Sequence, residues 1–241
     1  MRMNDPQRYR EAWEGYWEAT SDEPGEAIWD ADPSLSAVPH SELLLPYADA
    51  SLPVVDLGCG NGTQTRYLAT RFAHAIGVDL SHAAIGHARR ADTEGVAEFA
   101  QLDLTDGDAV RALHERIGDA NVYMRAVIHQ GEAEARPAVA AAVATMLGAR
   151  GRAFVAELTP ASKDVLRLAA QGPDGPPKKL RRVYDHGLKP ADAAEEEVPD
   201  LLRAAGLTTL DSGHTALPQT ERLSDGTRID LPARWFVLAV G

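Results

Sequence analysis

The 241-residue sequence contains a single cysteine, Cys59, so it cannot form an internal disulfide or a metal site built from several cysteines. It also lacks any run of about eighteen consecutive apolar residues, which excludes a membrane-spanning helix. The N-terminal region carries acidic side chains throughout and no continuous apolar stretch, so it does not resemble a secretory signal. These absences predict a cytoplasmic protein without a bound metal.

Positive charge is scarce as well. The chain carries 36 acidic against 24 lysine and arginine residues, a formal net charge of -12. Such a field repels a phosphate backbone, so we expect neither nucleic acid nor an anionic membrane as a partner. A small-molecule or peptide substrate is the remaining expectation, and the sequence does not indicate an oligomeric state.

Short apolar segments alternate with helix-length amphipathic segments from residue 52 to residue 158, a pattern typical of βαβ units. The predicted strands are 52–57, 75–78, 96–102, 122–128 and 152–158, and the predicted helices are 63–72, 81–91, 108–117 and 132–147. The alternation predicts an α/β protein with a parallel, helix-covered sheet.

Residues 1–50 precede this alternation and are predicted to form a helical cap, whereas residues 51–241 form the main domain. The first cap helix begins at Asp5-Pro6, and the second lies over 34–47 and is interrupted by Pro39. Residues 171–190 are rich in proline and glycine and are predicted to form a long loop over the substrate. A helix over 195–205 and strands over 207–210 and 235–240 follow.

The segment from Val54 to Gly62, VVDLGCGNG, places a glycine-rich turn directly after a buried strand. Doubly wound sheets bind ligands at this carboxyl end of their strands. Asp79 ends the second predicted strand, where a carboxylate can accept both hydroxyls of a ribose, and Asp103 ends the third, where it can accept from an adenine amino group. The three strand ends therefore predict a nucleoside site.

These three segments resemble the first three motifs of the class I S-adenosylmethionine-dependent methyltransferases: VVDLGCGNG, GVDLS over 77–81, and QLDL over 101–104. The resemblance implies a Rossmann-like sheet of seven strands whose last strand is antiparallel, with S-adenosylmethionine as cofactor. The binding residues that it implies are Asp56, Gly58, Cys59, Gly60, Asn61, Gly62, Asp79, Leu80, Asp103 and Leu104. Asp56 would orient the amino group, Asp79 would hold the ribose, and Asp103 with the Leu104 backbone would hold the adenine.

Two alternatives stay open. A nicotinamide-dependent oxidoreductase also uses glycines and an acid about twenty residues further on, but its spacing is G-x-G-x-x-G rather than G-x-G-x-G. The carboxylate of Asp56 would also lie beside the pyrophosphate of a nicotinamide cofactor and repel it. The second alternative is a binding module that keeps the adenosyl site and has lost methyl transfer.

A second resemblance lies in the cap, where WEGYW over 13–17 and IWDADP over 28–33 are similar to the N-terminal cap of the thiopurine, thiol and halide methyltransferases. It implies that Trp13 and Trp29 pack over the cofactor, whose sulfonium an aromatic face attracts. Tyr16 and Trp17 are then candidate substrate contacts. The alternative is that Trp13, Tyr16 and Trp17 simply dock the cap helix on the sheet.

Residues after the fourth predicted strand are candidates for catalysis: Tyr123, Arg125 and His129. His129 is a candidate general base or a structural histidine. Arg125 is a candidate for binding the cofactor carboxylate or an anionic substrate, or it forms an internal salt bridge. In the basic run 178–184, Arg182 and Tyr184 are candidate contacts for an anionic acceptor, unless the run is a solvated charged surface.

Overall fold

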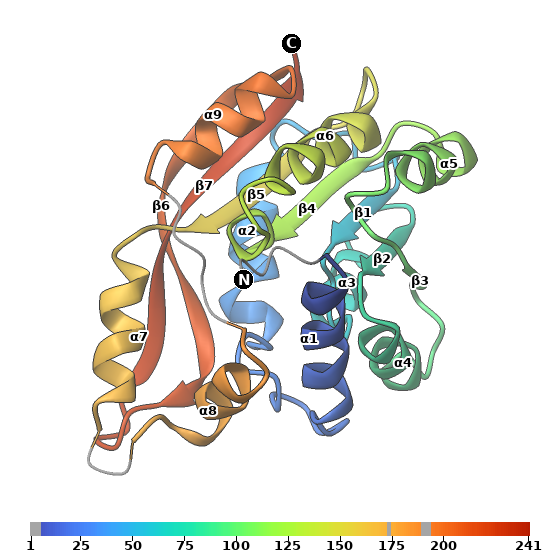
Figure 1. The fold of residues 1–241 in the computed structure, drawn as a ribbon. Coiled ribbons are helices and arrows are strands. Elements are labelled where there is room, and N and C mark those ends of the chain that lie inside the picture. The colour runs from blue at the N-terminus through green and yellow to red at the C-terminus, as the bar shows by residue number, and fades with distance from the viewer. Residues whose placement is uncertain (1–5, 173–174, 189–193) are drawn as a thin grey trace.

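The computed structural model describes residues 6–172, 175–188 and 194–241, and it contains a seven-stranded sheet in the order β3-β2-β1-β4-β5-β7-β6 (Figure 1). The strands are β1 (Val54–Leu57), β2 (Ala75–Asp79), β3 (Glu98–Gln101), β4 (Asn121–Arg125), β5 (Ala153–Leu158), β6 (Leu207–Arg222) and β7 (Arg228–Val240). The first five run parallel, and β7 is antiparallel to both β5 and β6. The predicted Rossmann-like sheet with an antiparallel last strand is confirmed.

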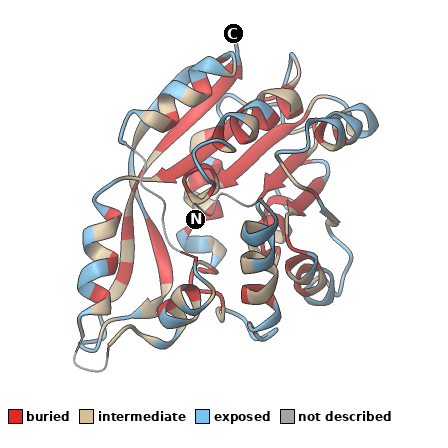
Figure 2. Cartoon of the chain, viewed as in Figure 1, coloured by how far each residue is buried: buried red, intermediate tan, exposed pale blue. Residues whose placement is uncertain are grey.

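Helices cover both faces of the sheet, which explains why all four residues of β1 are buried (Figure 2). The helices of the alternating part are α3 (Thr63–Leu68), α4 (His82–Ala91), α5 (Gly107–Ile117), α6 (Arg136–Leu147) and α9 (Glu197–Ala204). Side chains of α5, α6 and α9 pack on one face of the sheet, and those of α3 pack on the other. The Ser81 side chain caps α4 by accepting from the Ala84 amide.

The N-terminal segment forms α1 (Pro6–Glu18), a short 3-10 helix η1 (Pro33–Leu35) and α2 (Ala37–Leu44). Asp5, the predicted cap of α1, lies outside the described residues. The prediction that Pro39 interrupts the second helix is wrong. Pro39 is the third residue of α2, where a helix leaves the backbone N–H without an internal partner, so proline fits there.

The segment 171–190, predicted as an irregular loop, contains the helix α8 (Lys178–Asp185), and a further helix, α7 (Ser162–Ala170), precedes it. Leu180 and Val183 are buried on one side of α8, and the prediction of a loop over these residues is therefore wrong. Residues 173–174 and 189–190 of the segment lie outside the described part of the chain.

The last two strands are far longer than predicted, with 16 residues in β6 and 13 in β7. They leave the sheet as a two-stranded extension that runs between α7 and α8 (Figure 1). We call this part, over 215–222 and 228–233, the hairpin extension. Within the described residues, no helix has the length and apolar character needed to cross a membrane.

Candidate functional site

A cavity of about 610 Å³ opens at the carboxyl ends of the first four strands, between α1 and the hairpin extension. It is lined by the glycine turn after β1, the ends of β2 and β3, the turn after β4, and side chains of α1, α7 and α8. Ligand sites in proteins typically enclose 300–1,000 Å³, so the cavity has the size of a small-molecule site.

The glycine turn forms the floor of one end of the cavity. Gly60 has a φ of +55°, and a Cβ atom added there would lie 2.8 Å from Cζ2 of Trp17. Gly62 also has a positive φ, but it faces Phe99 and is not among the cavity-lining residues. Its predicted contact with the cofactor is therefore wrong, and it serves the packing of the turn. Gly58, Cys59 and Asn61, which the sequence assigns to the cofactor site, line the cavity.

Asp79 joins the glycine turn to the second strand. Its Oδ2 accepts the Gly60 amide at 2.9 Å, and its Oδ1 accepts the Ser81 amide at 2.9 Å. Burial raises the pKa of this carboxyl to about 6. Asp79 and the neighbouring Leu80 both line the cavity.

Asp56 lies one strand further along the sheet and is 3 % exposed. Its Oδ2 accepts from the Thr65 hydroxyl at 2.6 Å. Burial raises the pKa of Asp56 to about 6, although Thr65 and the positive charge of Arg125 both lower it. A carboxyl that is costly to ionise when the site holds no ligand suits a cationic ligand group.

Asp103 is the third carboxylate of the cavity and follows β3. Both of its carboxylate oxygens already contact other residues of the protein. Oδ1 accepts from the amide and hydroxyl of Thr105, and Oδ2 lies 2.7 Å from the Arg10 guanidinium. Burial raises the pKa of Asp103, but these hydrogen bonds and the charge of Arg10 outweigh it and lower the pKa overall. Leu104 lines the cavity beside Asp103.

Aromatic side chains of the N-terminal segment lie over this end of the cavity. Trp13 and Trp29 line it and contact each other edge-on, with ring centroids 5.3 Å apart. Trp17 lines it from the Gly60 side. Tyr9, which our sequence reasoning missed, lines it as well; its place one helical turn before Trp13 is the signal that was available.

Tyr16 does not face the cavity. Its side chain is fully buried, and its hydroxyl accepts from the Ile28 amide at 3.3 Å. The expected substrate contact of Tyr16 is therefore wrong, because the residue fastens α1 to the segment that carries Trp29.

β4 ends at Arg125, and Ala126 follows with a φ of +60°. The Arg125 guanidinium lines the cavity and donates to the Trp29 carbonyl at 2.8 Å and to the Ser36 hydroxyl at 3.1 Å. Among the described residues, no carboxylate forms a salt bridge with it. Tyr123 also lines the cavity, but its hydroxyl is held by Nδ1 of His40 at 2.9 Å.

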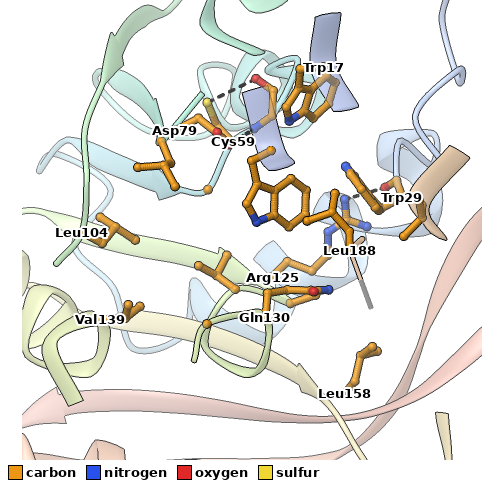
Figure 3. A pocket seen from close by; sticks show the side chains of 18 of the residues that line it. Trp17, Trp29, Cys59, Asp79, Leu104, Arg125, Gln130, Val139, Leu158 and Leu188 are labelled. Atoms are coloured by element: carbon orange, nitrogen blue, oxygen red, sulfur yellow. Dashed lines mark hydrogen bonds between the residues drawn. The ribbon is translucent and has the colours of Figure 1, made fainter. Parts of the chain in front are cut away.

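His129 lies behind the cavity wall, which favours the structural histidine over a general base that faces the transferred methyl group. It is 2 % exposed and absent from the cavity lining, and its Nδ1 is hydrogen-bonded to Glu157. The left-handed turn at Ala126 and the 3-10 helix η2 (Ile128–Gln130) direct Gln130 rather than His129 into the cavity (Figure 3).

The two candidate residues of the basic run 178–184, Arg182 and Tyr184, differ in whether they line the cavity. Tyr184 lines the cavity. Arg182 does not, because its guanidinium binds the Glu26 carboxylate at 3.0 Å and the Glu26 carbonyl at 3.1 Å. The expected contact of Arg182 with a substrate is therefore wrong. Across the part of the chain that the structure describes, no group of three or more His, Cys, Asp or Glu side chains is arranged to hold a metal ion.

Known proteins share the sequence motifs and the fold described above. A family profile described as a methyltransferase domain matches residues 54–151, which contain the glycine turn, Asp79 and Asp103. An S-adenosylmethionine-dependent methyltransferase from Anabaena variabilis is 28% identical, with a TM-score of 0.88 over 96% of this chain and 95% of that chain. The chain therefore contains a methyltransferase domain, and it shares the fold of S-adenosylmethionine-dependent methyltransferases.

More distant structures share the fold of this methyltransferase. One is a structure that concerns the conversion of a disulfide bond into a thioacetal group during echinomycin biosynthesis. It is 21% identical, with a TM-score of 0.66 over 96% of this chain and 92% of that chain. Another is the 1,6-didemethyltoxoflavin-N1-methyltransferase of Burkholderia thailandensis, 18% identical with a TM-score of 0.61 over 100% of this chain and 92% of that chain. A search of curated proteins finds no match.

Proposed function

We propose that this methyltransferase transfers the methyl group to an oxygen, nitrogen or sulfur nucleophile of a small molecule or peptide end bound in the same cavity. The observation that carries the proposal is that two groups of opposite charge line the cavity, where they would hold the amino and carboxylate groups of the cofactor. Asp56 supplies a carboxylate and Arg125 an unneutralised guanidinium, and they are close enough for the charge of Arg125 to lower the pKa of Asp56.

The other carboxylates fit the remaining parts of the cofactor. Asp79 is suited to the ribose hydroxyls, and Asp103 with Leu104 to the adenine. Trp13 and Trp29 place aromatic faces where a sulfonium gains from them. When bound, S-adenosylmethionine would supply an electrophilic methyl group to the acceptor.

The chain's own residues contribute positioning. The N-terminal segment covers the cofactor end, because Glu14 of α1 accepts from the Ser81 hydroxyl at 2.7 Å and from the Ala83 amide at 3.0 Å. Covering the site excludes water from a displacement whose rate depends on alignment of the reacting atoms.

Calorimetric titration with S-adenosylhomocysteine tests this assignment, with NADH as the control ligand. We expect adenosylhomocysteine alone to bind. Arg125→Met should weaken its affinity at least tenfold, because a charge-assisted hydrogen bond contributes roughly 1.5–3 kcal/mol. Unchanged affinity in that variant would refute the role given to Arg125. The control variant Arg203→Met removes an arginine from an exposed pair with Asp200 on α9 and should change nothing.

A further inference from the structure

The part of the cavity away from the glycine turn is lined by apolar side chains from β5, α7, α8 and the hairpin extension. They are Leu158, Leu166, Leu180, Val183, Leu217 and Leu231. Leu158 lies across the cavity from Cys59 and Asp79, with Arg125 and Gln130 between them in the view of Figure 3. We call this part the acceptor chamber.

Charged side chains enter the cavity from the glycine-turn side and from the end of β4 and the segment after it, which supply Arg125, Glu132 and Glu134, and not from the elements that form the acceptor chamber. Among the described residues of β5, α7, α8 and the hairpin extension, none that lines the cavity is charged. The basic residues of α8 are turned away from it: Lys179 Nζ donates to the Gly25 carbonyl at 2.7 Å, and Arg182 binds Glu26. The helix therefore presents Leu180, Val183 and Tyr184 to the chamber and uses its cations to attach itself to the N-terminal segment.

One amide interrupts this apolar lining. Gln219 is 6 % exposed and lines the cavity, and its Nε2 donates to the Leu217 carbonyl at 3.0 Å. That bond orients the side chain, since an amide nitrogen must face a carbonyl oxygen. Its Oε1 has no hydrogen-bond partner within the described part of the chain, so it is free to accept a hydrogen bond from a ligand.

We propose that the methyl acceptor is an uncharged, largely apolar small molecule that donates one hydrogen bond to Oε1 of Gln219. The proposal deepens the proposed function and rests on it. An ionised acceptor would lose its hydration in the chamber and meet no charged partner there, which is strongly unfavourable. A neutral apolar molecule gains from burial against the leucine side chains, and the single amide selects its orientation.

The test uses the full chain saturated with S-adenosylhomocysteine, and calorimetry with four probes that share one ring system: 2-naphthol, naphthalene, 2-naphthoate and 2-naphthylmethylammonium. We expect 2-naphthol to bind at least tenfold more tightly than either charged probe. It should bind about fivefold more tightly than naphthalene, which has no donor for Gln219.

Two variants with matched controls locate the binding. Val183→Phe fills the chamber and should weaken 2-naphthol binding at least tenfold, whereas Leu168→Phe, on the 62 % exposed Leu168 of α7, should not. Gln219→Met should reduce 2-naphthol affinity to that of naphthalene, whereas Gln171→Met at the exposed end of α7 should not. Retained adenosylhomocysteine affinity shows that each variant is folded.

The outcomes separate the two proposals. Failure of the wild-type chain to bind adenosylhomocysteine would refute the cofactor assignment on which both rest. If adenosylhomocysteine binds and a charged probe matches 2-naphthol, or if none of the four probes binds, the acceptor proposal is wrong. The probe series uses the wild-type chain, so it decides the question even where Val183→Phe fails to fold.

Discussion

Arg10 of α1 lies 2.7 Å from Oδ2 of Asp103, two residues after β3, so an ion pair ties the N-terminal helix to the segment that follows the third strand. The hydrogen bonds of Glu14 to Ser81 and Ala83 form a second tie, to the start of α4. Both ties cross the end of the cavity that we assign to the nucleoside. A cofactor that enters or leaves by this route must displace α1. The two ties should therefore influence the rate at which the cofactor is released.

Replacing Arg10 by Gln should therefore speed the release of S-adenosylhomocysteine. The pair is partly exposed, and such pairs contribute about 0–1 kcal/mol, so the dissociation rate should rise by no more than about fivefold, with little change in melting temperature. Stopped-flow tryptophan fluorescence measures the rate, because Trp13 and Trp17 line the cavity. Arg203→Gln, in an exposed pair on α9, is the control. A slower release would contradict the covering role of α1.

Asp56→Asn should stabilise the ligand-free protein above pH 6 while weakening cofactor binding. Burial raises the pKa of this carboxyl to about 6 from an ordinary value of 3.8, so ionisation destabilises the folded state. A difference of about two pKa units corresponds to about 3 kcal/mol. The asparagine removes the ionisable proton and keeps an oxygen for Thr65.

The gain in stability from Asp56→Asn should depend on pH. The cost of ionising Asp56 is complete above the folded pKa of about 6, and it is lost as the pH falls from 6 toward 3.8. Urea unfolding of the ligand-free chain should therefore show a large advantage of Asp56→Asn at pH 8 and a small one at pH 4. An advantage that is equal at both pH values would point to a cause other than ionisation. Titration with adenosylhomocysteine at pH 8 should show at least a tenfold loss of affinity.

The cofactor end of the site was predictable from sequence because its determinants are local. A buried strand, three glycines and a carboxylate at the next strand end specify the turn and the approach of Asp79 to Gly60 without reference to distant residues. The sequence left the role of position 129 open between a base and a structural histidine, for a physical reason. The strand ends at Arg125, and the positive φ of Ala126 turns the chain, so a residue counted along an ideal strand points elsewhere.

The acceptor chamber depends instead on contacts between distant segments, which no local pattern reports. α8 contains many polar residues, and it is held as a helix by contacts of Leu180 and Val183 with residues far away in sequence. The hairpin extension contains Pro218 and Pro232, which ordinarily argue against a strand interior. They are accommodated because the extension has only two strands, so one edge of each needs no backbone donor.

Gly60→Ala should abolish tight cofactor binding. The residue has a φ of +55°, and the added Cβ would lie 2.8 Å from Trp17, so both backbone strain and a clash oppose the substitution. Gly95→Ala is a matched control, since Gly95 has a φ of +66° and open space around the added atom. Strain alone costs roughly 1–2 kcal/mol. We expect both variants to lose that much stability in urea, but only Gly60→Ala to lose adenosylhomocysteine affinity, by at least tenfold. Equal affinities in the two variants would show that the Trp17 contact has no part in the site.

Glu157→Gln should damage both stability and cofactor binding, although Glu157 does not line the cavity. This carboxylate is 2 % exposed, and it accepts the backbone amides of Val127 at 2.9 Å, Ile128 at 2.8 Å and His129 at 3.2 Å. It thereby holds the turn that directs Gln130 into the cavity. A glutamine has one accepting oxygen where the glutamate has two, so at least one buried amide loses its partner, at a cost of about 1–3 kcal/mol. Glu42→Gln, at an exposed position on α2, is the control.

His129→Gln separates a positioning role from general-base catalysis. The histidine touches Glu157 and is absent from the cavity lining, so its replacement should lower the free energy of unfolding by loosening the same turn. Once an acceptor is in hand, the pH profile of kcat should keep its shape in this variant, because a residue behind the wall does not take the acceptor's proton. Loss of an acidic limb from that profile would restore His129 as the base and would require the turn after β4 to rearrange when ligands bind. Retention of the limb together with reduced stability would assign His129, with Glu157, to positioning.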